Sequence, residues 1–168
     1  AVSPVYSVSV MGDELFSFDF EEPSQVDEWF DLAGFWDIEG GLFYELEDAG
    51  GPLVTVTGDP GLTDVAITVE GMGLVGDADW GIAFRVFDIN NFYSWQFVNA
   101  GLDLILYSGG TRSELYTSEY PEELNEWQKF QVIVKGNVIY MYFNDEIQAV
   151  VEDDTLEAGQ VGLFGWIN

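Results

Sequence analysis

The sequence predicts an all-β protein built as an antiparallel β-sandwich, and three observations carry this prediction. Helical periodicity is nearly absent, and many short segments alternate between apolar and polar residues instead. Turn signals such as "EGG", "AGG", "SGG" and "KGN" separate these segments at short intervals. Many short strands joined in this way are typical of β-sandwiches and jelly rolls.

The expected strands follow one another along the chain without a linker or an internal repeat. The one stretch that favours a helix is "PSQVDEWF", and it is short. A hydrophobic content of 48% argues against disorder despite the high charge. We therefore expect one jelly-roll domain over residues 13–168. Its strands are expected at residues 14–20, 35–39, 41–47, 53–57, 62–71, 80–88, 91–99, 102–107, 113–117, 127–136, 138–143, 145–151 and 160–167.

Residues 1–12 carry a strand pattern of their own, over residues 4–11, and are expected to form an N-terminal extension of the sandwich. An isolated strand has unpaired backbone groups on both edges. It therefore either folds back onto its own sheet or adds to the sheet of a neighbouring subunit, as in donor-strand polymers. The apolar residues of this assembly strand are Val5, Tyr6, Val8 and Val10.

The charge balance excludes some partners. Four basic residues face 31 acidic ones, which gives a net charge of −27. Such a molecule repels nucleic acid and anionic lipid surfaces. Three interpretations stay open: a solvated acidic surface suited to high salt, cation binding, and a basic partner.

Two residue types are missing, and their absence limits the chemistry. The chain has neither cysteine nor histidine, so disulfides, thiolate chemistry, zinc sites and histidine-based triads are excluded. No apolar run is long enough to span a membrane, so membrane insertion is not expected. Ala1 stands where an initiator methionine would, which we interpret as a terminus left by signal-peptide removal in an extracellular protein.

The stretch "WGIAFRVFDINNFYSWQF" predicts a hairpin whose two faces differ. Pairing across a turn at residues 89–90 places Arg85 opposite Ser94 and Ala83 opposite Gln96. One face then belongs to the core, and the other is either a binding face or an ordinary outer sheet face with Arg85 paired to an acid. The expected core face holds Trp80, Ile82, Phe84, Val86, Tyr93, Trp95 and Phe97, and the other holds Ala83, Arg85, Phe87, Phe92, Ser94 and Gln96.

Five motifs in a particular order resemble one family. They are "FSFDFEEPSQVDEWF", "GFWDIEGGLFYEL", "DWGIAFRVFDINNFYSWQF", "EWQKFQVIVKGNVIYMYFNDE" and "DDTLEAGQVGLFG". Together, over residues 15–167, they resemble the concanavalin A-like, laminin-G-like jelly rolls of secreted microbial proteins. The resemblance implies two curved antiparallel sheets, of which the concave one often binds sugars. Relatives include glycoside hydrolases, carbohydrate-binding modules and adhesion domains, so the fold alone does not select a function.

The resemblance also implies a structural Ca²⁺ where the first strand of the domain meets the penultimate loop. Calcium takes roughly 6–8 oxygen ligands, mostly from carboxylates and carbonyls. A carbonyl of Gly40 or Gly41 would complete this shell, and solvated loop acids are the alternative. The matching acids are Asp19, Glu21, Glu22, Asp153 and Asp154, and a second candidate group is Asp77, Asp79 and Asp88.

Sugar binding requires aromatic rings, because a ring face stacks on the apolar face of a pyranose. Tyr107 and Tyr116 lie near the loop that follows "LILYSGG", a usual position for the rim of a binding site in this family. Arg112 would suit an acidic glycan, although the overall charge opposes one. The expected glycan face is Arg85, Ser94, Gln96, Tyr107, Arg112 and Tyr116.

Catalysis is not expected. Retaining glycosidases need two carboxylates about 5 Å apart. The fold-related family-16 glycanases carry them as Glu-x-Asp-x-x-Glu on one strand, and none of the expected strands of this chain contains that spacing. The favoured function is an extracellular structural subunit that assembles into a filament or tube through its N-terminal strand, with calcium. The alternative is a non-catalytic carbohydrate-binding or adhesion module that uses the concave sheet face.

Overall fold

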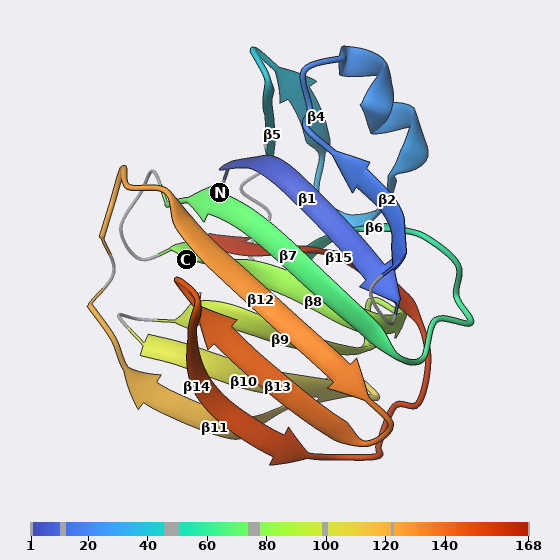
Figure 1. Cartoon of the computed structure of the whole chain (residues 1–168), viewed down its shortest axis with the longest axis vertical. Coiled ribbons are helices and arrows are strands. Elements are labelled where there is room, and N and C mark those ends of the chain that lie inside the picture. The colour runs from blue at the N-terminus through green and yellow to red at the C-terminus, as the bar shows by residue number, and fades with distance from the viewer. Residues whose placement is uncertain are drawn as a thin grey trace.

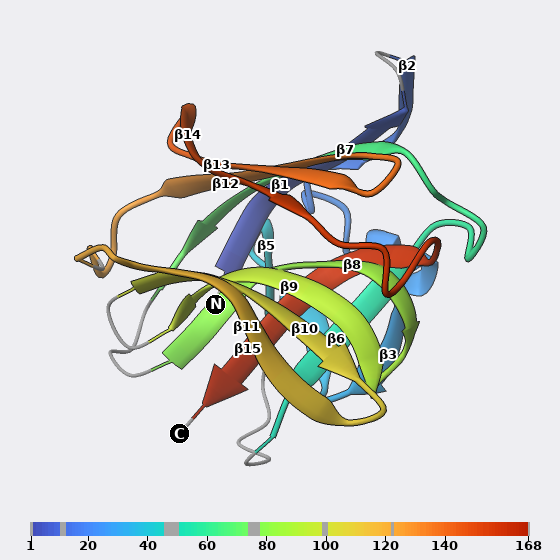
Figure 2. The ribbon, with the colours of Figure 1, turned by 90° about the horizontal axis from the view of Figure 1, so that it is seen from below.

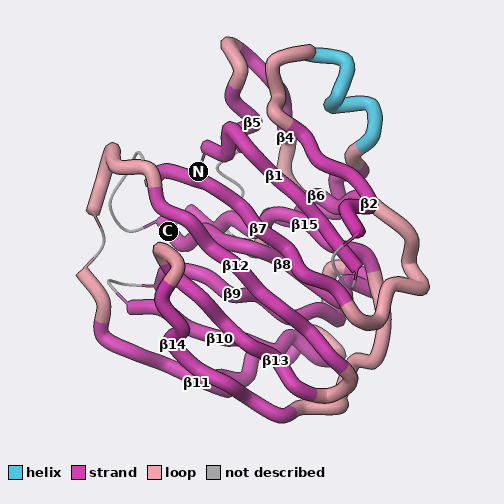
Figure 3. Tube along the Cα trace, viewed as in Figure 1, coloured by secondary structure: helices cyan, strands magenta, loops and turns pink. Residues whose placement is uncertain are grey.

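The chain folds into two antiparallel sheets packed face to face, as the computed structural model in Figure 1 shows. The structure describes residues 2–10, 13–45, 51–73, 78–98, 101–121 and 123–167. Seen from below, the two sheets form separate layers (Figure 2), and strand dominates the chain (Figure 3). The predicted antiparallel β-sandwich is therefore confirmed.

One sheet has eight strands in the order β14–β13–β12–β7–β1–β5–β4, with β2 paired to β1 beside β5. Along β12 and β13, buried side chains on the inner face alternate with partly exposed side chains on the outer face. These strands are β1 (Val2–Val10), β2 (Asp13–Phe18), β4 (Trp36–Glu39), β5 (Leu42–Glu45), β7 (Val65–Met72), β12 (Gln128–Lys135), β13 (Val138–Phe143) and β14 (Glu146–Glu152).

The other sheet has seven strands in the order β11–β10–β9–β8–β15–β6–β3. The stretch predicted to favour a helix forms the short 3₁₀ helix η1 (Pro23–Glu28), and β3 follows it directly. The seven strands are β3 (Phe30–Ala33), β6 (Leu53–Thr57), β8 (Ala78–Asp88), β9 (Asn91–Val98), β10 (Gly101–Ser108), β11 (Thr111–Glu119) and β15 (Gln160–Ile167).

The core between the sheets is rich in aromatic rings. Trp80 of the seven-stranded sheet meets Phe130 of the eight-stranded sheet edge to face, with ring centroids 5.0 Å apart. Phe97 and Phe143 make a similar contact at 5.2 Å. Pairs of this kind add about 0.5–1.5 kcal/mol each beyond the area they bury. With no disulfide in the chain, this layer holds the two sheets together.

Strand β1 is paired on both edges within its own chain. Tyr6 faces Val69 of β7 on one side and Phe18 of β2 on the other, and the beginning of β1 also pairs with β5. The alternative in which the N-terminal strand folds back onto its own sheet therefore describes this structure. Donation of β1, with Val5, Tyr6, Val8 and Val10, to a neighbouring subunit stays a prediction that would require β1 to leave these partners.

The predicted register of the β8–β9 hairpin is wrong by two residues. Ser94 faces Ala83 instead of Arg85, and Gln96 faces Gly81 instead of Ala83. The cause is a β-bulge between Phe84 and Asp88, where β8 carries more residues than β9 and Arg85 has a φ of +48°.

The bulge also changes which residues share a face. Up to Phe84 the predicted faces are correct, because Trp80, Ile82 and Phe84 lie in the core between the sheets. Beyond the bulge, Val86 packs on the opposite face, with Phe92, and Arg85 leaves the strand alternation altogether.

No helix in the described part of the chain is long and apolar enough to cross a membrane.

Candidate functional site

The outer face of the seven-stranded sheet holds a compact group of side chains, which we call the sheet-face cluster. The Phe92 ring stacks on the Tyr107 ring at a centroid distance of 4.4 Å, and both rings lie about 6 Å from Phe164. The cluster is therefore filled by its own side chains. Its buried apolar members are Val54, Val56, Ala83, Val86, Phe92, Ile105, Tyr107 and Phe164.

The buried polar residues of this sheet include Ser94, Gln96 and Asp103. The Ser94 hydroxyl donates a hydrogen bond to Gln96 Oε1, and Gln96 faces Asp103 across strands β9 and β10. Burial, together with the nearby Glu114 carboxylate, raises the pKa of Asp103 above its usual value. Ser94 and Gln96 are 0% and 1% exposed, so these two residues of the expected glycan face are not presented to a ligand.

The tyrosines and Arg112 of the expected glycan face separate in the structure. Tyr107 is buried in the sheet-face cluster, and burial raises the pKa of its hydroxyl to about 12. Arg112 is partly exposed and forms an ion pair with Glu114 at 2.6 Å.

Tyr116 lies on the core side instead of the outer face. Its ring contacts Trp95, and its hydroxyl donates to the carbonyl of Gln148 at 3.3 Å. A register shift in β11 places Tyr116 opposite Leu104 of the core and Glu114 opposite Ile105.

Arg85 departs furthest from its expected place. Its side chain leaves the sheet face and reaches three loops at one end of the sandwich, where it is 3% exposed. Its guanidinium donates to the carbonyl oxygens of Leu156 at 2.9 Å, Thr63 at 3.4 Å and Gly136. The bulge at this position aims the side chain away from Ser94 and Gln96. Arg85 thus connects loops at the end of the sandwich and does not lie on the sheet face with Ser94 and Gln96.

A hollow lies over Arg85 at this end of the sandwich, and we call it the loop-end hollow. Its volume is about 270 Å³. A shallower hollow of about 450 Å³ adjoins it, shares Glu157, and includes Phe87 and Leu156. The loop-end hollow is lined by Thr63, Asp64, Arg85, Gly136, Asn137, Asp154 and Glu157.

Hydrogen bonds fix the loops around the hollow. Asp64 Oδ1 accepts from the amide of Gly136 at 2.8 Å, which joins the β6–β7 loop to the β12–β13 turn. The Tyr93 hydroxyl donates to Asp153 Oδ1, which also accepts from the amide of Thr155 at 2.9 Å. Together with the three carbonyls on Arg85, these bonds hold the hollow in one shape before any ligand arrives.

Burial and charge shift the pKa values at this end of the sandwich. Burial lowers the pKa of Arg85, although Tyr93, Asp64, Glu157 and Asp153 oppose the shift. Burial and the hydrogen bond to Asp153 raise the pKa of Tyr93 to about 12. Burial acts to raise the pKa of Asp153, but hydrogen bonds from Tyr93 and Thr155 outweigh it and hold that pKa below its usual value. Such groups gathered around a hollow are typical of functional sites.

The side chains at the rim have few partners of their own. Asp154 and Glu157 are exposed, and within the described residues neither carboxylate accepts a hydrogen bond or joins an ion pair. The side chain of Asn137 is likewise exposed at the rim. Phe87, in the adjoining hollow, is 78% exposed. Together they offer hydrogen-bond acceptors, an amide and an apolar ring.

The first predicted calcium group is split in the structure. Asp19 accepts hydrogen bonds from Gln25 at 2.9 Å and from the amide of Glu21 at 3.2 Å, just beyond the end of β2. Asp153 lies just beyond the end of β14, which is separated from β2 in the sheet by β13, β12, β7 and β1. Asp19, Glu21 and Glu22 are therefore not brought together with Asp153 and Asp154.

The second predicted calcium group does not gather either. Asp77 lies outside the described residues. Asp79 and Asp88 occupy opposite ends of β8, roughly 25–30 Å apart at a strand rise of about 3.3 Å per residue. Within the part of the chain that the structure describes, no three acidic side chains stand close enough together to hold a metal ion. Calcium binding stays a prediction.

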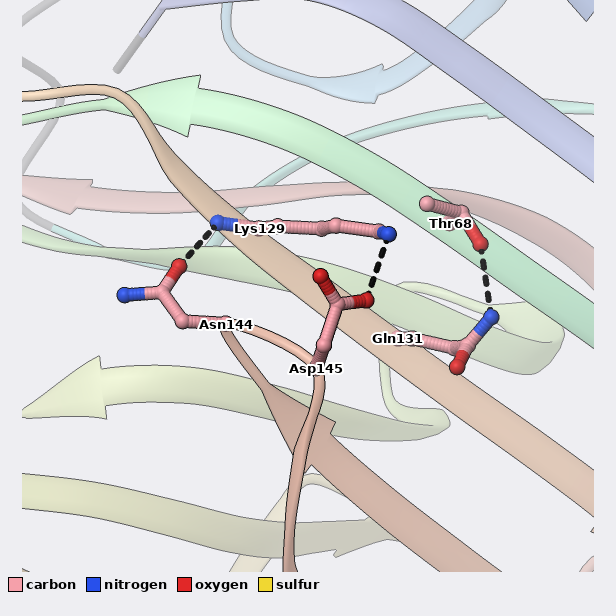
Figure 4. A network of polar contacts seen from close by, with 5 residues as sticks. All are labelled: Thr68, Lys129, Gln131, Asn144 and Asp145. Carbon is pink, nitrogen blue, oxygen red and sulfur yellow. Dashed lines mark hydrogen bonds and ion pairs between the residues drawn. The ribbon is translucent and has the colours of Figure 1, made fainter.

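The outer face of the eight-stranded sheet carries a polar network of a different kind (Figure 4). Lys129 Nζ pairs with Asp145 Oδ1 at 2.6 Å, and the Gln131 amide donates to the Thr68 hydroxyl at 3.0 Å. The Asn144 side chain accepts from the amide of Lys129 at 2.8 Å. These groups are engaged with one another along β7, β12 and the following turn, so they stabilise the sheet.

Comparisons with known proteins identify the fold. No family model matches the chain, and no curated protein matches it in sequence. The carbohydrate-binding module CBM66 from Bacillus subtilis superposes with a TM-score of 0.73 over 83% of this chain and 88% of that chain, at 18% identity. A Bacillus subtilis protein of unknown function with a galectin-like fold gives 0.67 over 88% and 86%, at 11% identity. The transglycosylase Crh5 gives 0.63 over 96% and 68%, at 11% identity.

The fold is a concanavalin A-like jelly roll. The resemblance noted in the sequence is thereby confirmed at the level of the fold. Both binding modules and enzymes of carbohydrate metabolism occur among the similar structures, so the fold does not decide between them.

The sequence does not show that the residues of the loop-end hollow come together. Asp64, Asn137 and Glu157 each lie in or next to a stretch that predicts a turn, but nothing in their spacing shows that three loops meet. The bulge at Arg85 sits in an unbroken strand pattern, without a glycine to mark it. Asp153 and Asp154 were singled out for calcium, and Asp154 lies in this hollow instead.

Proposed function

We propose that this protein is a non-catalytic carbohydrate-binding module that recognises a polysaccharide through the loop-end hollow. One observation carries the proposal. In the hollow, the side chains of Asp154, Glu157 and Asn137 have no hydrogen-bond partners among the described residues, and they lie beside the exposed ring of Phe87 on loops that Arg85 holds in place. The structural likeness to a carbohydrate-binding module supports it.

The chemistry of a sugar matches this arrangement. A sugar hydroxyl donates well to a carboxylate, and hydrogen bonds with a charged partner are the stronger kind. The apolar face of a pyranose stacks on an exposed aromatic ring such as Phe87. Because the loops are already fixed by hydrogen bonds, little conformational freedom is lost when the ligand binds.

The carboxylates of the hollow do not suit glycoside hydrolysis. A glycosidase needs an acid whose pKa is raised, with a second carboxylate nearby. The pKa of Asp153 is held below its usual value, which is the opposite of what a general acid requires. Asp103 has a raised pKa but is buried on the sheet, and its neighbour Glu114 is paired with Arg112. We therefore propose binding without catalysis.

Polysaccharides occur mainly outside cells, so the proposal places the protein there. Filament assembly and calcium are not part of the proposed function, because β1 already has partners on both edges and the predicted calcium ligands are split. A homopolymer would also have to overcome repulsion between subunits of charge −27.

Affinity gel electrophoresis tests the proposal directly. The protein is run through gels that contain β-glucan, xylan, galactomannan, starch or fructan, with pectin and hyaluronan as acidic polysaccharides. We expect at least one neutral polysaccharide to slow the protein, and no new reducing ends when the two are incubated together. Unchanged mobility in every gel would overturn the proposal, and released reducing ends would overturn its non-catalytic part.

A further inference from the structure

The two adjoining hollows differ in depth and in lining. The loop-end hollow has the buried Arg85 as its floor and three loops around it, whereas the neighbouring hollow is shallow and flanked by Phe87 and Leu156. Glu157 belongs to both. Two hollows that share one wall make two consecutive subsites for a chain of linked units.

We propose that the loop-end hollow binds the terminal residue of a neutral glycan, with the next residue stacked on Phe87. This inference rests on the proposed function and adds the part of the glycan and the class of sugar that are recognised. In this arrangement Asp154 and Asn137 contact the terminal residue, Glu157 lies between the two residues, and Phe87 contacts the second.

The size of the hollow and the position of its neighbour favour a chain end. At about 270 Å³ the hollow lies near the lower limit of ligand sites, which run from about 300 to 1,000 Å³, so one sugar residue fills it. An internal residue of a glycan must leave its site in two directions. The adjoining hollow, which shares Glu157, receives a neighbouring residue in one direction.

The charges around the hollow favour a neutral sugar. Asp64, Asp153, Asp154 and Glu157 surround one arginine, and the terminal nitrogens of that arginine are bonded to carbonyls. A uronic acid or a sulfated sugar would add a negative charge to this group of acids and would be repelled. A neutral sugar instead donates its hydroxyls to them.

Arg85 also leaves one donor unsatisfied at the floor. Its Nε is buried and has no hydrogen-bond partner among the described groups. Buried donors in native structures nearly always have a protein or water partner. A polar group bound in the hollow would offer this donor, on a side chain that is 3% exposed and lines the hollow, the partner that it lacks among the described groups.

Single substitutions at the rim test where the glycan binds. Asp154→Ala and Glu157→Ala each remove a carboxylate, and Phe87→Ala removes the ring. We expect each to weaken binding about tenfold in titration calorimetry with the polysaccharide that slows the wild type. All three residues are exposed, so the melting temperature of each variant should equal that of the wild type. Glu152→Ala, an exposed acid on β14, and Phe30→Ala, an exposed ring on β3, are the matched controls and should bind as the wild type does.

Chain length tests whether an end is recognised. The bound polysaccharide is cut to shorter oligomers by limited acid hydrolysis, which multiplies the ends at constant mass. If an end is recognised, the inhibitory potency per gram rises in proportion to the number of ends. If the interior is recognised, the potency per gram stays flat or falls as the oligomers shorten.

The outcomes separate the two proposals. If the wild type binds, the rim variants weaken and potency follows the number of ends, the inference holds. If the wild type binds but the rim variants equal their controls, or potency does not follow the ends, the inference is overturned and the proposed function stands. Preference for pectin or hyaluronan over every neutral polysaccharide would overturn the neutral-sugar part. Absence of binding to any polysaccharide overturns both.

Discussion

The outer face of the seven-stranded sheet and the loop-end hollow both carry polar side chains, but these side chains are engaged in different ways. On the sheet face, Ser94 donates to Gln96 and the rings of Phe92 and Tyr107 stack, so these side chains pack against one another. In the hollow, backbone carbonyls accept hydrogen bonds from the terminal nitrogens of Arg85, which leaves Asp154 and Glu157 available. Polar residues chosen from strand alternation can therefore be structural, while the available ones lie on loops.

The largest expected effect separates two phenylalanines. Phe92→Ala should lower the free energy of unfolding by about 3–5 kcal/mol, because it empties a stacked, fully buried position in the sheet-face cluster. Phe87→Ala should change it by less than about 0.5 kcal/mol, because that ring is 78% exposed. Urea denaturation measures both. Equal losses of unfolding free energy in the two variants would show that the sheet face and the hollow do not differ in this way.

Removal of the buried guanidinium should come next in size. Arg85→Met leaves the carbonyls of Leu156, Gly136 and Thr63 without their donor and should destabilise the fold by about 3 kcal/mol. Arg112→Met is the matched control, since its pair with Glu114 is largely exposed and should contribute less than about 1 kcal/mol. Urea midpoints with unchanged slopes would report this difference. Similar losses for both arginines would show that the loops do not depend on Arg85.

Asp153 and Asp103 should respond to pH in opposite directions. The pKa of Asp153 is lowered in the folded state, so its stabilising effect is present above its unfolded pKa and is lost as pH falls through the folded value. Asp153→Asn should lower the free energy of unfolding by about 1 kcal/mol near neutral pH. This difference in stability between variant and wild type should shrink as the pH drops below 4. Thermal melts across this range measure it. A constant difference at every pH would contradict the assignment.

The smallest effect concerns Asp103. The pKa of this residue is raised in the folded state, so its ionisation opposes folding as pH rises above the unfolded value. Asp103→Asn should therefore stabilise the protein near pH 7, by less than about 1 kcal/mol, and lose this advantage near pH 3. The same melts serve as the readout. Destabilisation of the variant at neutral pH would show that the carboxylate has a favourable partner there.

The sequence allowed the two sheets and most of their faces to be predicted, because apolar alternation directly reports which side of a strand is buried. This held for β9 and for β8 up to Phe84. It failed at Arg85, because a non-glycine residue with positive φ leaves no mark in the pattern. Strand β3 was also missed, since its four residues follow directly on η1 and resemble the end of a helix.

The candidate site was harder to predict than the fold. Its residues come from loops that are distant in the sequence, and only the closed sandwich brings Asp64, Asn137 and Glu157 together. The calcium ligands were predicted from the same family resemblance that correctly predicted the fold. That resemblance placed Asp154 in a loop but did not show which other side chains surround it.

Both strands nearest the ends of this chain lie inside a sheet instead of at its edge. β1 is bordered by β7 and by β2 and β5, and β15 lies between β8 and β6. While a ribosome synthesises the chain, one edge of β1 has no partner until β7 has emerged. In the seven-stranded sheet, β8 and β6 are not joined until β15 has emerged between them. Folding should therefore be slow, with unpaired strand edges exposed until β15 has emerged. Chaperone capture of nascent chains that end before β15 should be stronger than capture of nascent chains that include it.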